Sequence, residues 1–525
     1  MPHISVTSSD IAVLLVYVLG TRIILGWYMS LKMKAGNAES YFLADRNLSW
    51  PIIGLSFYVS NMSGSTFVGL AGSGYHDGIA VFHYEWLPAV ILVIFAFAIL
   101  PVLYNTKIYT APEYLKNRFD VRSQRVFSCF LLCANIFIDA AAALYAGGMI
   151  MKVLIPGIEL WQSAWIISLI AGVYIIFGGL GAVVLNDTIQ AFMIFAGGTA
   201  VAVMTWMRVP SWDAVAASVP ERALHLIRPV SDPVMPWPGI ITGVFIVGIY
   251  FWCTNQFMIQ RALGARSLDH GRKGALFAGF LKLPNLFILI IPGVMAVSLY
   301  PDIERADMVF PLLAFDMMPV GLRGLMLAAL AAAILSSLES IFNSAATLLT
   351  MDFLRHIPAM DERRLVTAGR WATVIFMILA SLWAPQIEGF PALWQYLQSI
   401  LSYVTPPVVV VFLGGIFRRS ATAEGAFLTL IIGIPMGVAA WVMNEIMGLF
   451  SIQYLYACGA LFAVNCVIMS AVSSVSGKKQ LNDVTETAAD FPYQAIPGVF
   501  LIWKDYRILS AILLIAVIFL LVWWW

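Results

Sequence analysis

Stretches of mostly apolar residues, each close to the roughly 20 residues that an α-helix needs to cross a bilayer, recur along the whole 525-residue chain. This pattern predicts an all-α integral membrane protein, and the composition agrees, because 61% of the residues are hydrophobic and only 11% are charged. The stretch at 322–352 is longer than one crossing requires, so we expect it to tilt or to extend beyond the bilayer. We predict fourteen spans, near residues 10–30, 50–72, 83–105, 126–150, 159–179, 185–207, 238–259, 275–299, 322–352, 368–385, 391–415, 423–443, 451–473 and 507–525.

Polar and small residues interrupt the second of these spans. Residues 57–75 carry Ser, Asn, Thr and Gly where a simple membrane helix would carry Leu and Val. Backbone groups at membrane depth need hydrogen-bond partners, so such a break is tolerated where it faces protein or a watery cavity. Close packing of helices through small residues is the alternative explanation. Because the run also contains Asn61, we favour a binding site.

A second polar interruption lies at 248–264, within and just beyond the seventh span. Each interrupted span opens a set of five spans, and paired breaks of this kind indicate an inverted-repeat transporter with its substrate site at the breaks. The polar residues of this second break are Thr254, Asn255, Gln256 and Gln260. The expected division is a peripheral first helix with its loop (1–49), a first repeat with an outside loop (50–236), a second repeat (237–421) and peripheral C-terminal helices (422–525) with a cytoplasmic linker at 475–506.

The positive charges are distributed unevenly between alternate loops. Since loops rich in Lys and Arg stay in the cytoplasm, we expect both chain termini outside. The outside loops contain no Asn-x-Ser/Thr sequon, which favours a bacterial inner membrane over a glycosylated cell surface. A net charge of +1 gives no indication of nucleic-acid binding. The rich loops are those near 32–46, 107–125, 261–273, 355–370, 418–419 and 478–507.

The span at 322–352 carries a polar stripe. Ser336, Ser340, Asn343 and Thr347 are spaced at i, i+4, i+7 and i+11, which places them on one face of a helix. Hydroxyl and carbonyl oxygens are ligands for a small hard cation, and Na⁺ fits neutral oxygens. The adjacent Ser337 strengthens this interpretation. Alternatively, each hydroxyl bonds to its own helix.

Several ionisable side chains are predicted within the membrane, where each costs roughly 2.5 to 3.5 kcal/mol. Glu85 and Lys282, together with Gln398, offer the acceptors and donors that a substrate with many hydroxyls needs. A buried ion pair that only joins two helices is the alternative. Asp187 either caps a helix or lies on the cation's exit path. Glu339 is protonated, paired or a ligand of a second cation.

Five segments together resemble the sodium/solute symporter family, and within it the sodium/glucose, galactose or myo-inositol branch. The resemblance runs from about residue 10 to at least residue 420. It rests on SNMSGSTFVGLAGSGY, FHYEW, YIIFGGLGAVVLNDTIQAFMIFAGG, QRALGARSLDHGRKGALFAGFLKL and LAALAAAILSSLESIFNSAATLLTMD.

The resemblance implies about fourteen helices with a LeuT-like core of two inverted five-helix repeats. It implies a sodium site made by the carbonyls of Val59, Met62 and Ala333 and the hydroxyls of Ser336 and Ser337. It implies substrate contacts from Asn61, Ser65, Thr66, Glu85, Lys282 and Gln398. A sodium pathway or second ion site is implied at Asp187, Glu339 and Ser340, and a gate at Tyr250, Phe251 and Trp252.

The chain departs from the family pattern at four places. Phe251 stands where a gating tyrosine is expected, and the neighbouring Tyr250 is turned about 100° away along a helix. Gly248, Pro88 and Thr66 replace polar partners of the sugar. The particular sugar or polyol therefore stays open, as does the alternative of an acidic or amino-acid substrate such as sialic acid, a carboxylate or proline.

A non-transporting membrane sensor or channel is a further alternative. An enzyme is disfavoured, because the sequence has neither HExxH nor GxSxG. Beyond sodium, the substrate and the lipid bilayer, we expect no nucleic-acid or obligate protein partner.

Overall fold

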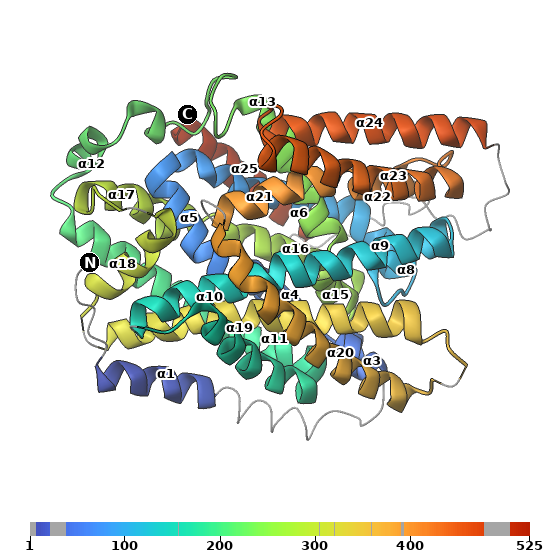
Figure 1. Ribbon diagram of the computed structural model, residues 1–525, viewed down its shortest axis with the longest axis horizontal. Coiled ribbons are helices and arrows are strands. Elements are labelled where there is room, and N and C mark those ends of the chain that lie inside the picture. Colours follow the sequence, from blue (N-terminus) through green and yellow to red (C-terminus); the bar gives the residue numbers. More distant parts are fainter. Residues whose placement is uncertain are drawn as a thin grey trace.

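The computed structural model describes residues 7–20, 38–155, 157–303, 305–319, 321–358, 360–389, 393–476 and 505–524. These ranges are mostly helical, with turns and loops between the helices, and they contain isolated bridges but no strand (Figure 1). Ten of the described helices are long and apolar enough to cross a membrane, and a bent helix pair adds an eleventh. The structure therefore confirms an all-α integral membrane protein.

Nine predicted spans coincide with single candidate membrane helices. These helices are Ile79–Asn105, Val121–Lys152, Trp237–Thr254, Leu268–Leu299, Leu322–Leu354, Glu362–Gly389, Ala423–Ile446, Tyr454–Val475 and Tyr506–Trp523. Several of them pass through a π-helical turn, such as η5 (Ala134–Ala140) and η8 (Tyr250–Thr254). The second half of the predicted span at 10–30 and nearly all of the predicted linker at 475–506 lie outside the described residues.

The predicted span at 185–207 coincides with a further candidate membrane helix, Val183–Arg208, and the predicted span at 159–179 overlaps the shorter apolar helix Leu160–Gly172. Both lie in the continuous 49-residue helix α11 (Leu160–Arg208). The residues between them, 180–184, include glycine but no proline. Glycine lowers helix propensity by about 1 kcal/mol without removing a backbone donor, so the helix continues. The span predicted at 391–415 is instead broken. Its halves, α21 (Leu393–Val404) and α22 (Pro406–Phe417), meet at 51°, because Pro406 and Pro407 interrupt the hydrogen-bond ladder.

Helix α19 (Leu322–Leu348) runs through the middle of the molecule. Its side chains are buried almost continuously from Met326 to Leu348, as expected for a helix that is apolar on every face apart from one polar stripe. Around it pack α1 (Ser8–Gly20), α4 (Trp50–Asn61), α5 (Gly64–Asp77), α10 (Ala141–Leu154), α11, α15 (Gln256–Leu263) and α20 (Glu362–Trp383).

The remaining helices surround this centre. α6 (His83–Ile94) packs on α16 (Leu268–Lys282), which also contacts α4. α23 (Ala423–Trp441) and α24 (Tyr454–Val475) lie together at the upper right of Figure 1, and α25 (Tyr506–Trp523) packs on α16. These last three helices expose many large apolar side chains, as lipid-facing helices do.

Candidate substrate and cation site

The first predicted break is confirmed between α4 and α5. Helix α4 ends at Asn61, and α5 begins at Gly64 after two non-helical residues, Met62 and Ser63. Ser63 caps α5, because its Oγ accepts a hydrogen bond from Thr66 N at 3.1 Å. The run of Ser, Asn and Gly thus supplies both the end of one helix and the start of the next.

This break frees two backbone carbonyls. In a continuous helix, Ser63 N would bond to Val59 O and Thr66 N to Met62 O. Here Ser63 N donates to Asn61 O at 3.0 Å, and Thr66 N donates to Ser63 O at 3.0 Å. The carbonyls of Val59 and Met62 therefore lose their helical partners and are available to a cation.

The hydroxyl-rich face of α19 lies against the break. Ser60 Oγ is 3.3 Å from Ser340 Oγ, and Gly64 approaches Ile334 so closely that a Cβ would lie 2.5 Å from its Cγ1. Ser337 Oγ donates to Ala333 O at 3.0 Å, which is the bond within the helix that the sequence left as an alternative. A hydroxyl that donates its hydrogen still has oxygen lone pairs for a cation.

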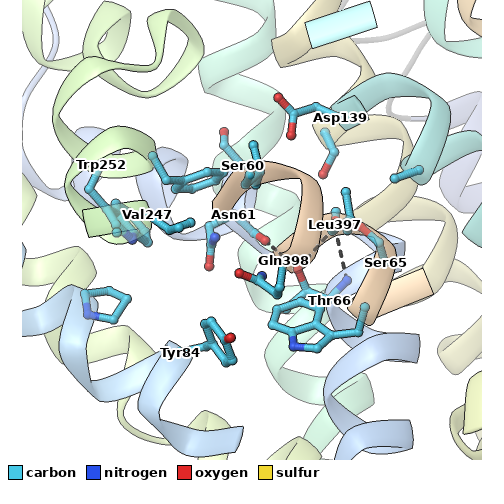
Figure 2. A pocket seen from close by; sticks show the side chains of 18 of the residues that line it. Ser60, Asn61, Ser65, Thr66, Tyr84, Asp139, Val247, Trp252, Leu397 and Gln398 are labelled. Atoms are coloured by element: carbon cyan, nitrogen blue, oxygen red, sulfur yellow. Dashed lines mark hydrogen bonds between the residues drawn. The ribbon is translucent and has the colours of Figure 1, made fainter. Parts of the chain in front are cut away.

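A cavity of about 110 Å³ opens beside the break (Figure 2). It is bounded by α4 and α5, by α6, by η8 and by α21, and Ser337 of α19 forms part of its wall. Among the residues that the sequence predicts for the substrate, the gate or the cation, the cavity is lined by Asn61, Ser65, Thr66, Glu85, Phe251, Trp252, Ser337 and Gln398. The predicted residues outside the lining include Lys282, Tyr250, Asp187, Glu339 and Ser340.

Lys282 lies directly behind Glu85. Its Nζ is 2.5 Å from Glu85 Oε2, and it also donates to Asn61 Oδ1. Both members of this ion pair are fully buried. Asn285 donates to the same Glu85 oxygen and accepts from Tyr58 OH at 2.9 Å. Lys282 thus neutralises and orients the carboxylate that faces the cavity, and its role toward a substrate stays a prediction.

The second break is confirmed at Asn255, between η8 and α15, but its polar side chains do not face the cavity. Gln256 bonds to Ala111 N at 2.7 Å and to Tyr109 O at 3.1 Å. Gln260 donates to Phe42 O at 2.7 Å and to Thr347 Oγ1 at 3.0 Å. These side chains attach α15 to its neighbours.

The interpretation of Asp187 as a helix cap is wrong, because Asp187 lies within α11 and not at its start. It is fully buried and forms an ion pair with Arg261 at 3.2 Å. It also accepts from Ser56 Oγ and, at 2.6 Å, from Ser336 Oγ. Arg261 donates to Ser340 Oγ at 2.5 Å, so four helices meet at this pair. Assigning Arg261 to a cytoplasmic loop is therefore also wrong.

Two other predicted residues are not part of the cavity lining. Tyr250 is buried and packs edge-on against Phe130, with ring centroids 5.9 Å apart. Glu339 is fully buried in α19 and accepts from Asn186 Nδ2 at 3.1 Å. Within the described ranges, no group of three or more His, Cys, Asp or Glu side chains is arranged to hold a metal ion.

An aromatic pair separates the cavity from a second, outer cavity of about 400 Å³. Tyr84 and Trp394 line both spaces, and their rings pack edge to face with centroids 5.5 Å apart. Tyr84 OH lies 3.2 Å from Tyr454 OH. Sequence reasoning did not single out Tyr84, nor did it single out Asp139 and Asn285. A polar residue inside an apolar span was the available signal for the last two.

A membrane-embedded cavity at a broken helix, with freed carbonyls and hydroxyls beside it, defines a transporter of small solutes. Residues 41–433 match the sodium:solute symporter family, and the chain belongs to it. It is therefore a sodium-coupled symporter and not an enzyme.

Curated relatives support this assignment. The chain is 34% identical over 513 residues to the sodium/glucose cotransporter of Vibrio parahaemolyticus, covering 92% of this chain and 93% of the relative. It is 32% identical to sodium/glucose cotransporter 4 of Danio rerio, covering 89% of this chain and 78% of the relative. It is 32% identical to human sodium/myo-inositol cotransporter 2, covering 90% of this chain and 77% of the relative.

Solved structures agree on the fold. A substrate-bound, outward-open sodium-coupled sialic acid symporter superposes with a TM-score of 0.77 at 21% identity, covering 89% of this chain and 98% of that chain. The nucleobase-cation-symport transporter Mhp1 gives a TM-score of 0.52 at 12% identity, covering 83% and 96%.

Proposed function

We propose that this protein imports a neutral monosaccharide or polyol together with sodium by alternating access. The observation that carries the proposal is the shared position of the two sites: Ser337 belongs to the predicted sodium ligands and also lines the cavity with Glu85 and Gln398. A sodium ion bound there contacts the wall of the substrate site. Sodium and substrate then stabilise the same arrangement of α4, α5 and α19, which is the requirement for coupling.

The proposed sodium ligands are the carbonyls of Val59, Met62 and Ala333 and the hydroxyls of Ser336 and Ser337. The break supports this assignment, because it removes the helical partners of Val59 O and Met62 O. Asp187 accepts from Ser336 Oγ and so fixes that hydroxyl's orientation. We propose one sodium ion, since Arg261 already occupies the space between Asp187 and Ser340.

The cavity lining suits a substrate with many hydroxyls. Asn61, Ser65, Thr66 and Gln398 offer amide and hydroxyl groups, and Gln398 Oε1 has no hydrogen-bond partner among the described residues. Trp252 and Trp394 provide flat apolar faces for a sugar ring. The names of the curated relatives, which are glucose and myo-inositol cotransporters, support the same class.

The transport cycle that we propose uses the family's architecture of about fourteen helices with two inverted five-helix repeats. Tyr84 and Trp394 close the substrate cavity toward the outer cavity, and Phe251 and Trp252 belong to the opposite gate. We also propose a bacterial inner membrane with both termini outside. The sequence gives an orientation from its loop charges, and the lipid-facing helices α23 to α25 suit a bilayer.

The driving force is sufficient for accumulation. One charge that moves through 100 mV yields about 2.3 kcal/mol, and a tenfold sodium gradient adds about 1.4 kcal/mol. Their sum of roughly 3.7 kcal/mol supports several-hundredfold accumulation of a neutral sugar at one-to-one coupling.

The test is uptake of labelled glucose, galactose and myo-inositol into proteoliposomes, with and without an inward sodium gradient. We expect one of the three to accumulate only with the gradient. If none accumulates while the reconstituted protein is folded, the polyol assignment is contradicted. Accumulation of sialic acid or proline in the same vesicles would then assign the protein to the alternative substrate class.

A further inference from the structure

The proposed transport mechanism gives no role to one carboxylate that lines the cavity, that of Asp139. Asp139 lies in the π-helical turn η5, which interrupts the helix between α9 (Val121–Cys133) and α10. π-Helical turns redirect side chains and are frequent at functional sites. Figure 2 shows Asp139 beside the cavity, on the side opposite Tyr84.

The charge of Asp139 is not balanced by the protein. Among the described residues that line the cavity, Glu85 and Asp139 are the only carboxylates, and none is Lys, Arg or His. Glu85 is neutralised by Lys282 at 2.5 Å. Among the described residues, no cationic side chain forms an ion pair with Asp139.

The hydrogen bonding of Asp139 is also incomplete. Its Oδ2 has no partner within the described residues, although the side chains of Asn255 and Tyr250 lie next to it. Asn255 Nδ2 and Tyr250 OH likewise have no partner there. A carboxylate that has one buried oxygen without a partner and no cation beside it favours a hydrogen-bond donor or a cation from outside the protein. The occupant of the cavity is the nearest source of either.

We propose that Asp139 determines the charge preference of the substrate site: it binds a hydroxyl or ammonium donor of the substrate and repels a substrate carboxylate. This inference rests on the proposed function and narrows it to neutral and cationic polyols. Two charges of like sign within a few ångströms of each other in a site of low dielectric constant disfavour binding by roughly tenfold or more. Like charges of this kind give specificity by rejecting the wrong substrate.

The experiment compares three sugars with the same ring and different charge: glucose, glucosamine and glucuronate. Thermal unfolding of the detergent-solubilised protein is titrated with each sugar at saturating sodium near neutral pH, and the apparent Kd is taken from the rise in Tm. We expect glucosamine to bind at least tenfold more tightly than glucuronate. In Asp139→Asn, we expect this ratio to fall by about tenfold, because the variant keeps the shape and removes the charge.

Two further variants separate local charge from general effects. Asp139→Glu keeps the charge and should preserve the order of the three sugars, even if all bind more weakly. Asp77→Asn removes a carboxylate from the outer cavity, where His76 Nδ1 lies 2.8 Å from it, and should leave the ratio as in the wild type.

An unchanged ratio in Asp139→Asn would overturn the inference, as would tighter binding of glucuronate than of glucosamine by the wild-type protein. These binding titrations do not depend on transport. Absence of sodium-driven uptake therefore counts against the proposed function, and an unaltered charge preference counts against the role of Asp139.

Discussion

The two helix breaks look alike in sequence and differ in what they do. Both interrupt an apolar span with Asn and neighbouring polar residues. At the first break, the polar side chains from Ser60 to Thr66 face the substrate cavity. At the second, Gln256 and Gln260 bind backbone and side-chain groups of neighbouring segments, and Arg261 forms a buried ion pair with Asp187. A polar break therefore either lines a binding cavity or anchors its helix to neighbouring segments, depending on which elements lie opposite it.

The opposing elements explain the difference. The first break faces α19 at its hydroxyls, which offer a cation neutral oxygens and are themselves small enough to leave a cavity. The second break faces carbonyls of other segments and a carboxylate within α11, which satisfy the donors of Gln256, Gln260 and Arg261. Satisfied donors contribute to stability, whereas unsatisfied oxygens beside a cavity are available to a ligand.

The largest expected effect comes from breaking the anchor. Arg261→Met leaves Asp187 buried without its cation, and loss of one member of a buried pair costs about 3 to 5 kcal/mol. We expect a large drop in Tm in detergent. The double variant Arg261→Met with Asp187→Asn should recover much of that loss, because it removes the stranded charge. A wild-type Tm in the single variant would show that the second break is not an anchor.

A steric change at the first break should act on sodium instead. In Gly64→Ala, the new methyl group would lie 2.5 Å from Ile334 Cγ1, which pushes the break away from α19. Overpacking of this kind costs about 1 to 3 kcal/mol. We expect the sodium concentration for half-maximal uptake to rise by about tenfold or more.

Gly198→Ala is the matched control, because its nearest neighbour would lie 3.6 Å away. Ile334→Ala in the Gly64→Ala background should restore part of the sodium affinity. If the sodium dependence of Gly64→Ala equals that of the wild type, then contact between the break and α19 does not set sodium affinity.

The smallest expected effects come from one substitution at each of the two breaks. Gln260→Ala removes two hydrogen bonds of the anchor, at 2.7 and 3.0 Å, and should lower stability by about 1 to 3 kcal/mol with unchanged sugar affinity. Asn61→Ala in the cavity wall should weaken sugar binding with a smaller change in Tm. Both variants are measured by thermal unfolding and by sugar titration. Weaker sugar binding in Gln260→Ala, together with a larger loss of stability in Asn61→Ala, would contradict the distinction between the two breaks.

The fold was largely predictable from sequence because span length and apolar content are local properties. Ten spans and both breaks follow from them. The continuous helix α11 and the bend at Pro406 were not predicted, since a glycine-containing junction was read as a loop and a proline pair was read as part of one span. Both errors concern how strongly a single residue interrupts a helix.

The partners of site residues were less predictable. Asp187 and Arg261 are 74 residues apart, and nothing in the sequence indicates that they meet. The sequence placed Glu85 and Lys282 in the membrane and offered pairing as one alternative, which the structure shows at 2.5 Å. Asp139 was recognisable in the sequence as a carboxylate in a predicted span, but only the structure shows that it lines the cavity.

The central claim is that sodium and sugar meet at the first break, and sodium dependence of sugar binding tests it most directly. Binding of a labelled neutral sugar is measured at increasing sodium concentration in the wild-type protein and in Ser337→Ala. Since coupling is reciprocal, sodium should tighten sugar binding in the wild type. The loss of one of five ligands should shift that dependence to higher sodium in the variant. Sugar binding that does not change with sodium concentration, or an identical sodium dependence in both proteins, would contradict the account.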